Sequence, residues 1–344
     1  MATFAWPSPR LGPTAGWWFA ALPALLVLTF GLSLVGFSSF DLGWHDLWTL
    51  LVAFDADNLS HQVLLTLRLP RAMVAMCVGA GLAVAGLVMQ GMTRNPLASP
   101  TVFGVSSGAA LAFAVSATGL VAWVSALPLM LVTFCGAGLA GLLVFFLGGL
   151  HRAPINPVRI VLAGVALNFL FLSMTRGAVI LADENAFGVF HWLTGSIGNV
   201  TYAEVRLAAP WTVLGLALAA WLGHDLNLLR LGEERMHNLG GGLARVRWLG
   251  SLVVILLVAA AVSVAGPIGF VGLIVPHIGR ALVGQDYRHL VPACALAGAI
   301  LILLADTLAR GLRFPDESPV GVVTTLLGAG FFLFLARRQL AEAP

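Results

Sequence analysis

Long runs of apolar residues follow one another along almost the whole chain, and they constrain its fold more than any other feature. The mean hydropathy is +0.96 and only 10% of the residues are charged, which excludes a soluble globular protein. A helix crosses the hydrocarbon core with about 20 apolar residues, and backbone in lipid must hydrogen-bond within itself. We therefore predict an all-α, polytopic membrane helix bundle of about ten transmembrane helices. The predicted spans are Trp17–Gly36, Ala72–Met92, Thr101–Ala122, Leu127–Gly149, Val158–Leu181, Ala208–Gly223, Trp248–Gly266, Phe270–Val283, Leu290–Leu308 and Val320–Ala336.

The distribution of arginine predicts the orientation of this bundle. All eighteen basic residues are arginines. With ten spans and both termini in the cytoplasm, five arginines fall on the outer side, Arg176 lies within a span, and the other twelve are cytoplasmic. This excess is the positive-inside bias that sets topology. The outer arginines are Arg68, Arg71, Arg206, Arg310 and Arg313. The inner arginines are Arg10, Arg94, Arg152, Arg159, Arg230, Arg235, Arg245, Arg247, Arg280, Arg288, Arg337 and Arg338.

The absence of lysine excludes several kinds of chemistry. A phosphate-binding P-loop uses a lysine, and a Schiff base needs a lysine amine. The cysteines Cys77, Cys135 and Cys294 are isolated within apolar runs, so we expect them to be small buried hydrophobic residues. Neither a metal-site spacing nor a disulfide framework is present. We expect no metal or cofactor to be bound by this chain.

Residues 1–344 form a single transmembrane domain in this interpretation, and three segments stand out from it. Segment 37–67 is an outer interfacial segment, because Trp44 and Trp48 are four residues apart in an amphipathic stretch. Segment 184–199 is predicted to be a short outer helix. Segment 224–247 is a charged, glycine-punctuated hairpin that arginine counting places in the cytoplasm. The first apolar run has the length of a span without a clear cleavage site, so we do not expect a cleaved signal.

Small residues predict how the spans pack. Gly79 with Ala83 and Gly136 with Ala140 have the four-residue spacing that lets helices approach closely in lipid. In GPIGFVGLIVPHIGR, Gly266-Pro267 and Pro276 predict a short, broken span. Such a break either lines a cavity or reflects packing alone.

Seven ordered blocks between Leu67 and Arg338 resemble the FecCD-type permeases, the membrane subunits of ABC importers for iron–siderophore, haem and vitamin B12. The blocks are RLPR, Gln90 with RNPLASP, VLAGVALN, HWLTGS, LNLLRLGEE, GPIGFVGLIVPHIGR, and LADTLAR with PVGVV. The resemblance implies a permease subunit of a type II importer, without enzymatic activity, in the bacterial inner membrane. Its implied partners are a second permease, identical or similar, two ATPase subunits that bind ATP and Mg, a periplasmic or lipid-anchored binding protein, and membrane lipid, with no nucleic acid.

The segment from Thr175 to Ser196 is most similar to the ferric-citrate branch of that family. The residues that carry this likeness are Thr175, Arg176, Ala182, Ala186, Gly188, Phe190, Trp192 and Leu193. Haem-type relatives tend to have methionine where this chain has Thr194. Another ferric siderophore, haem or cobalamin remains an alternative cargo.

The resemblance also implies four sites. The 224–247 hairpin couples to the ATPase, with apolar and charged residues suited to a helix-in-groove contact: Leu228, Leu229, Leu231, Gly232, Glu233, Glu234 and Arg235. Arg68, Arg71 and Arg310 dock glutamates of the binding protein, because arginine pairs bidentately with carboxylates. Interfacial anchoring by Arg68 and Arg71 is an alternative, as are other pairings among Arg310, Asp306 and Arg313.

The third implied site is a cytoplasmic gate formed by Asn95, Pro96 and Leu97, with a second constriction at Pro157 and Val158. Relatives commonly have hydroxyl residues at that second position, so this chain departs from the pattern there. The fourth is the translocation pathway, where Arg176 would attract an anionic chelate. The alternative for Arg176 is a structural pairing with Asp183 or Glu184.

The residues argue against two other classes of function. An ion-coupled secondary transporter requires carboxylates within the membrane, and only Asp306 comes near the interior of a span. An intramembrane enzyme finds little support, because the apolar runs hold neither an HExxH motif nor a pair of carboxylates.

Overall fold

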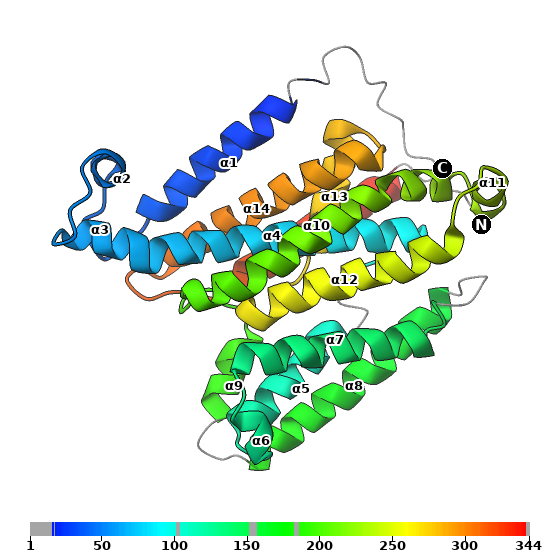
Figure 1. Cartoon of the computed structure of the whole chain (residues 1–344), viewed down its shortest axis with the longest axis horizontal. Coiled ribbons are helices and arrows are strands. Elements are labelled where there is room, and N and C mark those ends of the chain that lie inside the picture. The colour runs from blue at the N-terminus through cyan, green and yellow to red at the C-terminus, as the bar shows by residue number, and fades with distance from the viewer. Residues whose placement is uncertain (1–15, 17, 101–103, 151–156, 182–185, 342–344) are drawn as a thin grey trace.

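The computed structural model describes residues 16, 18–100, 104–150, 157–181 and 186–341, whose regular structure is entirely helical (Figure 1). The long helices are α1 (Trp18–Val35), α4 (Leu69–Thr93), α7 (Leu129–Leu147), α8 (Pro157–Leu181), α10 (Tyr202–Arg230), α12 (Leu243–Ala265), α14 (Tyr287–Leu312) and α15 (Val320–Ala341). The short elements are α2 (Trp44–Val52), α3 (Leu59–Val63), the π-helix η2 (Leu64–Arg68), α5 (Val105–Ala117), α6 (Ala122–Ser125), α9 (Ala186–Leu193), α11 (Glu233–Asn238) and α13 (Val271–Val283).

The predicted spans correspond to helices of two lengths. Seven helical runs are long and apolar enough to cross a membrane, and α5, α13 and the apolar part of α15 are shorter. Each predicted run overlaps one of these helices, several of which extend beyond it. The all-helical class is confirmed for the described residues, while the count of ten crossings stays a prediction.

Helix α4 is the centre of the bundle. Some 83% of its span is buried, against 22% for α1 and α8, and α4 contacts α10, α12, α13 and α14. Glycine makes this position possible, because Gly79 of α4 meets the backbone of Gly298 in α14 directly. Helices α5 to α9 form a second group that joins the first through contacts of α7 and α5 with α12 (Figure 1).

The bundle has two chemically different ends. One carries α2 and α3 and is called here the α2 end; the other carries α11 and is called the α11 end (Figure 1). Helix α1 begins near α14's first turn, where Phe19 packs edge-on against His289, and ends beside Arg310. Helix α15 begins at the α2 end, where the Gly321 N–H donates to Gly195 O. It then runs toward the α11 end (Figure 1). Which end faces the cytoplasm stays a prediction.

The predicted break in GPIGFVGLIVPHIGR is present. Helix α12 ends at Ala265 and α13 begins at Val271, with left-handed φ angles of 67° at Gly266 and 66° at Phe270. The carbonyl oxygen of Pro267 faces Gly195, leaving no room for a side chain there. The cavity beside this segment measures only about 10 Å³. Within the described residues, the broken segment packs against the loop after α9, and whether it also lines the pathway stays a prediction.

Candidate functional site

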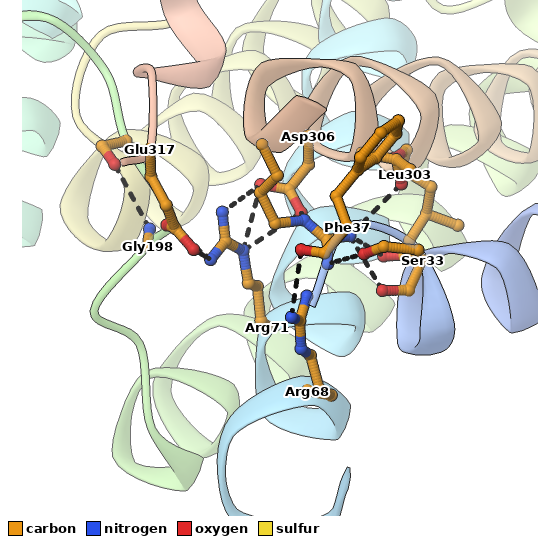
Figure 2. A network of polar contacts seen from close by, with 12 residues as sticks. Ser33, Phe37, Arg68, Arg71, Gly198, Leu303, Asp306 and Glu317 are labelled. Carbon is orange, nitrogen blue, oxygen red and sulfur yellow. Dashed lines mark hydrogen bonds and ion pairs between the residues drawn. The ribbon is translucent and has the colours of Figure 1, made fainter. Parts of the chain in front are cut away.

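Arg71 is held between two carboxylates at the α2 end. Its Nε donates to both oxygens of Asp306 at 3.1 Å, and Nη2 donates to Asp306 Oδ1 at 2.8 Å. On the other side, Nη1 donates to the Glu317 oxygens at 2.7 and 2.8 Å (Figure 2). The Asp306 side chain is 1% exposed and that of Glu317 is 44% exposed. Arg71 thus has one buried and one accessible partner.

Arg310 lies one helical turn after Asp306 and is enclosed by the fold. Its Nε is 3.4 Å from Asp306 Oδ2, and its Nη atoms donate to the carbonyl oxygens of Gly36 and Ser33, both at 2.8 Å. The alternative pairing with Asp306 is therefore the one that the structure contains. Docking by Arg310 stays a prediction, but its buried guanidinium joins α14 to the end of α1 and presents no free surface to a partner.

Arg68 is the third arginine of this cluster. It ends η2 and donates to Phe37 O at 3.3 Å (Figure 2). Its Nη1 is buried and makes no hydrogen bond, and no carboxylate of the described residues lies within 4 Å of its guanidinium. With Arg71 and Arg310, Arg68 makes three cations against the carboxylates of Asp306 and Glu317. The cluster thus carries one positive charge in excess.

A groove of about 440 Å³ opens beside these arginines. Its charged lining residues are Arg68, Arg71 and Glu317. The segment from Gly198 to Thr201 forms the facing wall, and Phe40 with Leu67 supplies apolar contact area. The groove has the size and charge to receive an acidic side chain.

Segment 224–247 differs in detail from the predicted hairpin. Helix α10 continues through its first seven residues to Arg230, and one short helix, α11, precedes α12. Leu229 is only 2% exposed and packs in the core, whereas Leu231 is 50% exposed. The left-handed Gly232, with φ 106°, turns the chain between α10 and α11. Glu234 and Arg235 are exposed on α11, so Leu231, Glu234 and Arg235 are the exposed members of the predicted coupling set.

Glu233 connects this segment to two other elements. It lies 3.2 Å from Arg247 in the first turns of α12 and 3.8 Å from Arg94, which follows α4. Arg94 caps α4 in a left-handed conformation with φ 50°. The predicted gate turn and the predicted coupling segment are therefore neighbours, joined through one carboxylate.

The gate turn is built by local hydrogen bonds. Asn95 Oδ1 accepts from the Leu97 N–H at 3.0 Å, and Asn95 O accepts from the Ala98 N–H at 3.1 Å. Leu97 is exposed at this turn, beside Pro96. The second predicted constriction is not a loop within the described residues, because Pro157 and Val158 already belong to the first turn of α8.

Arg176 lies in the last two turns of α8, and its side chain is exposed in the single chain. Its alternative partners Asp183 and Glu184 lie outside the described residues. Helix α9 covers residues 186–193 of segment 184–199, and a loop follows it. In segment 37–67, Trp44 and Trp48 of α2 are both largely exposed, and the interfacial position of this segment stays a prediction.

Sequence reasoning missed a polar clamp at the α11 end. Asn227 Nδ2 donates to Asp286 Oδ1 at 2.6 Å, and Arg230 Nη1 donates to Gln285 O at 2.6 Å. Burial alone raises the pKa of Asp286, but hydrogen bonds from the Arg288 N–H and Asn227, with the nearby positive charges, lower it below 3.8. An aspartate directly before an apolar helix is an N-cap signal that could have revealed it.

Several known proteins are similar to this chain in sequence and in the arrangement of their helices. The model of the FecCD transport family matches residues 25–338. The Fe(3+)-citrate import system permease protein YfmD of Bacillus subtilis is 42% identical, covering 92% of this chain and 93% of that protein. The Fe(3+) dicitrate transport system permease protein FecC of Escherichia coli is 39% identical, covering 92% and 95%. A solved metal-chelate type ABC transporter, in an inward-facing conformation, superposes with a TM-score of 0.81 at 32% identity, covering 93% of this chain and 98% of that one. The chain belongs to the FecCD transport family.

Proposed function

We propose that this chain is a permease subunit of a binding-protein-dependent ABC importer that moves a ferric chelate into the cytoplasm. The observation that carries the proposal is the match of the whole helix arrangement, at a TM-score of 0.81, to a metal-chelate type ABC transporter. The chain itself is no enzyme. ATP and Mg bind to a partner ATPase, because the chain lacks the lysine of a P-loop.

The α11 end is the proposed contact with the ATPase. Leu231, Glu234 and Arg235 offer an apolar residue beside charged ones, as in other helix-in-groove contacts. Movement of α11 reaches α12 through the Glu233–Arg247 pair and the gate turn through Glu233 and Arg94. ATP-driven closure of two ATPase subunits would thereby move α12 and the turn after α4 together.

A second permease subunit completes the pathway in this proposal. Helix α8 exposes a row of large apolar side chains in the single chain, including Leu162 and Phe169. A similar or identical subunit would face α8 across the pathway, with lipid around the rest of the bundle. Arg176 on the same helix would attract the anionic cargo.

Ferric citrate is the proposed cargo, since both similar permeases described above are named for it. The similarity of Thr175–Ser196 to that branch supports the same choice. Other ferric siderophores, haem and cobalamin are the alternatives to be compared in the same assay.

The experiment is uptake of radiolabelled ferric citrate into proteoliposomes that contain this chain, its partner permease, the ATPase and the binding protein. We expect uptake that requires ATP inside and the binding protein outside. Omitting the ATPase tests the ion-coupled alternative. Uptake that persists without it, or that stops only when the proton gradient is dissipated, would contradict the importer.

A further inference from the structure

Arg71 divides its donors between two carboxylates of unequal accessibility (Figure 2). Asp306 is buried in α14 and accepts from Nε and Nη2, whereas Glu317 lies between α14 and α15 and accepts from Nη1 alone. Glu317 also lines the groove described above. An exposed ion pair is worth much less than a buried one, because water and salt compete for both partners. Of the two carboxylates, Glu317 is the one that another carboxylate can replace at Arg71.

The backbone around Glu317 is held without its side chain. The Ser318 N–H donates to Ala309 O at 3.3 Å, and the Gly321 N–H donates to Gly195 O at 2.9 Å. These bonds fix the entry to α15 on either side of Pro319. The Glu317 side chain can therefore leave Arg71 while the loop stays in place.

Glu317 affects both the space and the charge in the groove. A Cβ added at Gly198 would lie 3.0 Å from Glu317 Oε2, so the absence of a side chain there makes room for the carboxylate. Arg68 borders the same groove, and among the described residues no carboxylate lies within 4 Å of its guanidinium. An incoming carboxylate would find the excess positive charge favourable but would be repelled by Glu317 and would compete with it for Arg71 Nη1.

We propose that Glu317 is a displaceable internal carboxylate that competes with an acidic side chain of a docking protein for Arg71. Glu317 thereby weakens docking at the α2 end and eases release after each cycle. Arg68 makes the first contact, Arg71 is released from Glu317 to make the second, and Arg310 stays inside the fold as the support of Asp306. This inference rests on the proposed importer, whose substrate-binding protein is the docking partner.

The test uses the assembled importer in nanodiscs and the substrate-binding protein encoded with it, with affinity measured by biolayer interferometry. Glu317→Gln should tighten binding about 5-fold or more, since a competing charge is removed. Asp316→Asn is the matched control: it removes the same charge one residue away, from an exposed pair with Arg313 at 3.5 Å, and should leave the affinity unchanged. Adding Arg68→Gln to Glu317→Gln should abolish the gain.

Unchanged or weaker binding by Glu317→Gln overturns the proposal, and so does an equal gain with Asp316→Asn. Should Glu317→Gln fail to assemble, Glu317→Ala removes the same carboxylate together with its stem; tighter binding then supports the proposal and unaltered binding overturns it. Arg68-dependent binding of free citrate to the groove, without the protein, would overturn the assignment of a protein partner. Absence of binding by the wild-type importer would instead contradict the proposed function itself.

Discussion

Gly79 of α4 and Gly298 of α14 face each other where the two helices cross, and a Cβ on either would overlap the backbone of the other. Gly79→Ala should therefore force the central helices apart and destabilise the chain by about 1–3 kcal/mol, the usual cost of overpacking. Gly138 of α7 has no neighbour within 4 Å of an added Cβ. Gly138→Ala should be neutral or stabilising by about 0.5–1 kcal/mol. Unfolding midpoints in detergent compare the two variants, and equal midpoints would contradict the role given to this crossing.

Asp306 is the buried carboxylate on which Arg71 and Arg310 converge. Asp306→Asn leaves both guanidinium groups without their charged partner inside the bundle, so we expect a loss of about 3–5 kcal/mol in the free energy of unfolding. The exposed pair Arg313–Asp316 provides the comparison, with side chains 76% and 72% exposed. Asp316→Asn should cost at most about 1 kcal/mol. Chemical unfolding in mixed micelles measures both variants, and similar losses would show that Asp306 is not the centre of the cluster.

Only part of this cluster could be predicted from the sequence. Asp306 and Arg310 are four residues apart on one apolar helix, a spacing at which side chains meet. Arg71 is 235 residues before Asp306, and nothing in a single sequence joins them.

At the end of α10, by contrast, the sequence itself indicates which residues are buried. Hydropathy falls at His224, yet Leu222, Leu226 and Leu229 continue the helical period and are all buried. Following the period would have placed Leu229 in the core instead of on the coupling surface.

Asp286 should give the first turn of α14 a stability that depends on acid. Its pKa is lowered below 3.8 in the folded chain, despite the opposing effect of burial, by hydrogen bonds from Arg288 and Asn227. A group with a lowered folded pKa contributes its stabilisation above its unfolded pKa, and that contribution is lost as the pH falls through the folded value. The Tyr287–Leu290 amides should therefore lose protection against hydrogen exchange, relative to the intrinsic rate at each pH, as the pH falls through the lowered pKa of Asp286. Asp286→Asn keeps a capping side chain but cannot titrate. An unchanged acid dependence in this variant would exclude Asp286 as its origin.

Arg176 is proposed to draw an anionic chelate toward the pathway. Arg176→Ala should lower the rate of ferric citrate uptake about 10-fold, because a fixed charge in a low-dielectric channel concentrates a counter-charge. Arg206→Ala serves as control, since it removes another exposed arginine from the first turns of α10, outside the proposed pathway. Uptake into proteoliposomes is measured for both at low and high salt. Normal uptake by Arg176→Ala would leave this arginine with a structural role alone.

Leu229 and Leu231 are two residues apart and should respond in opposite ways to substitution. Leu229 is 2% exposed at the end of α10, so Leu229→Ala should cost about 2–5 kcal/mol of stability. Leu231 is 50% exposed beside α11, and Leu231→Ala should change stability by no more than about 0.5 kcal/mol. The same Leu231→Ala variant should retain less ATPase on co-purification and show weaker stimulation of ATP hydrolysis by the binding protein, because it removes the apolar residue of the coupling surface. If Leu229→Ala instead folds normally and loses the ATPase, the coupling surface would have to include the buried face of α10, and the helix would need to unwind at Arg230 to present it.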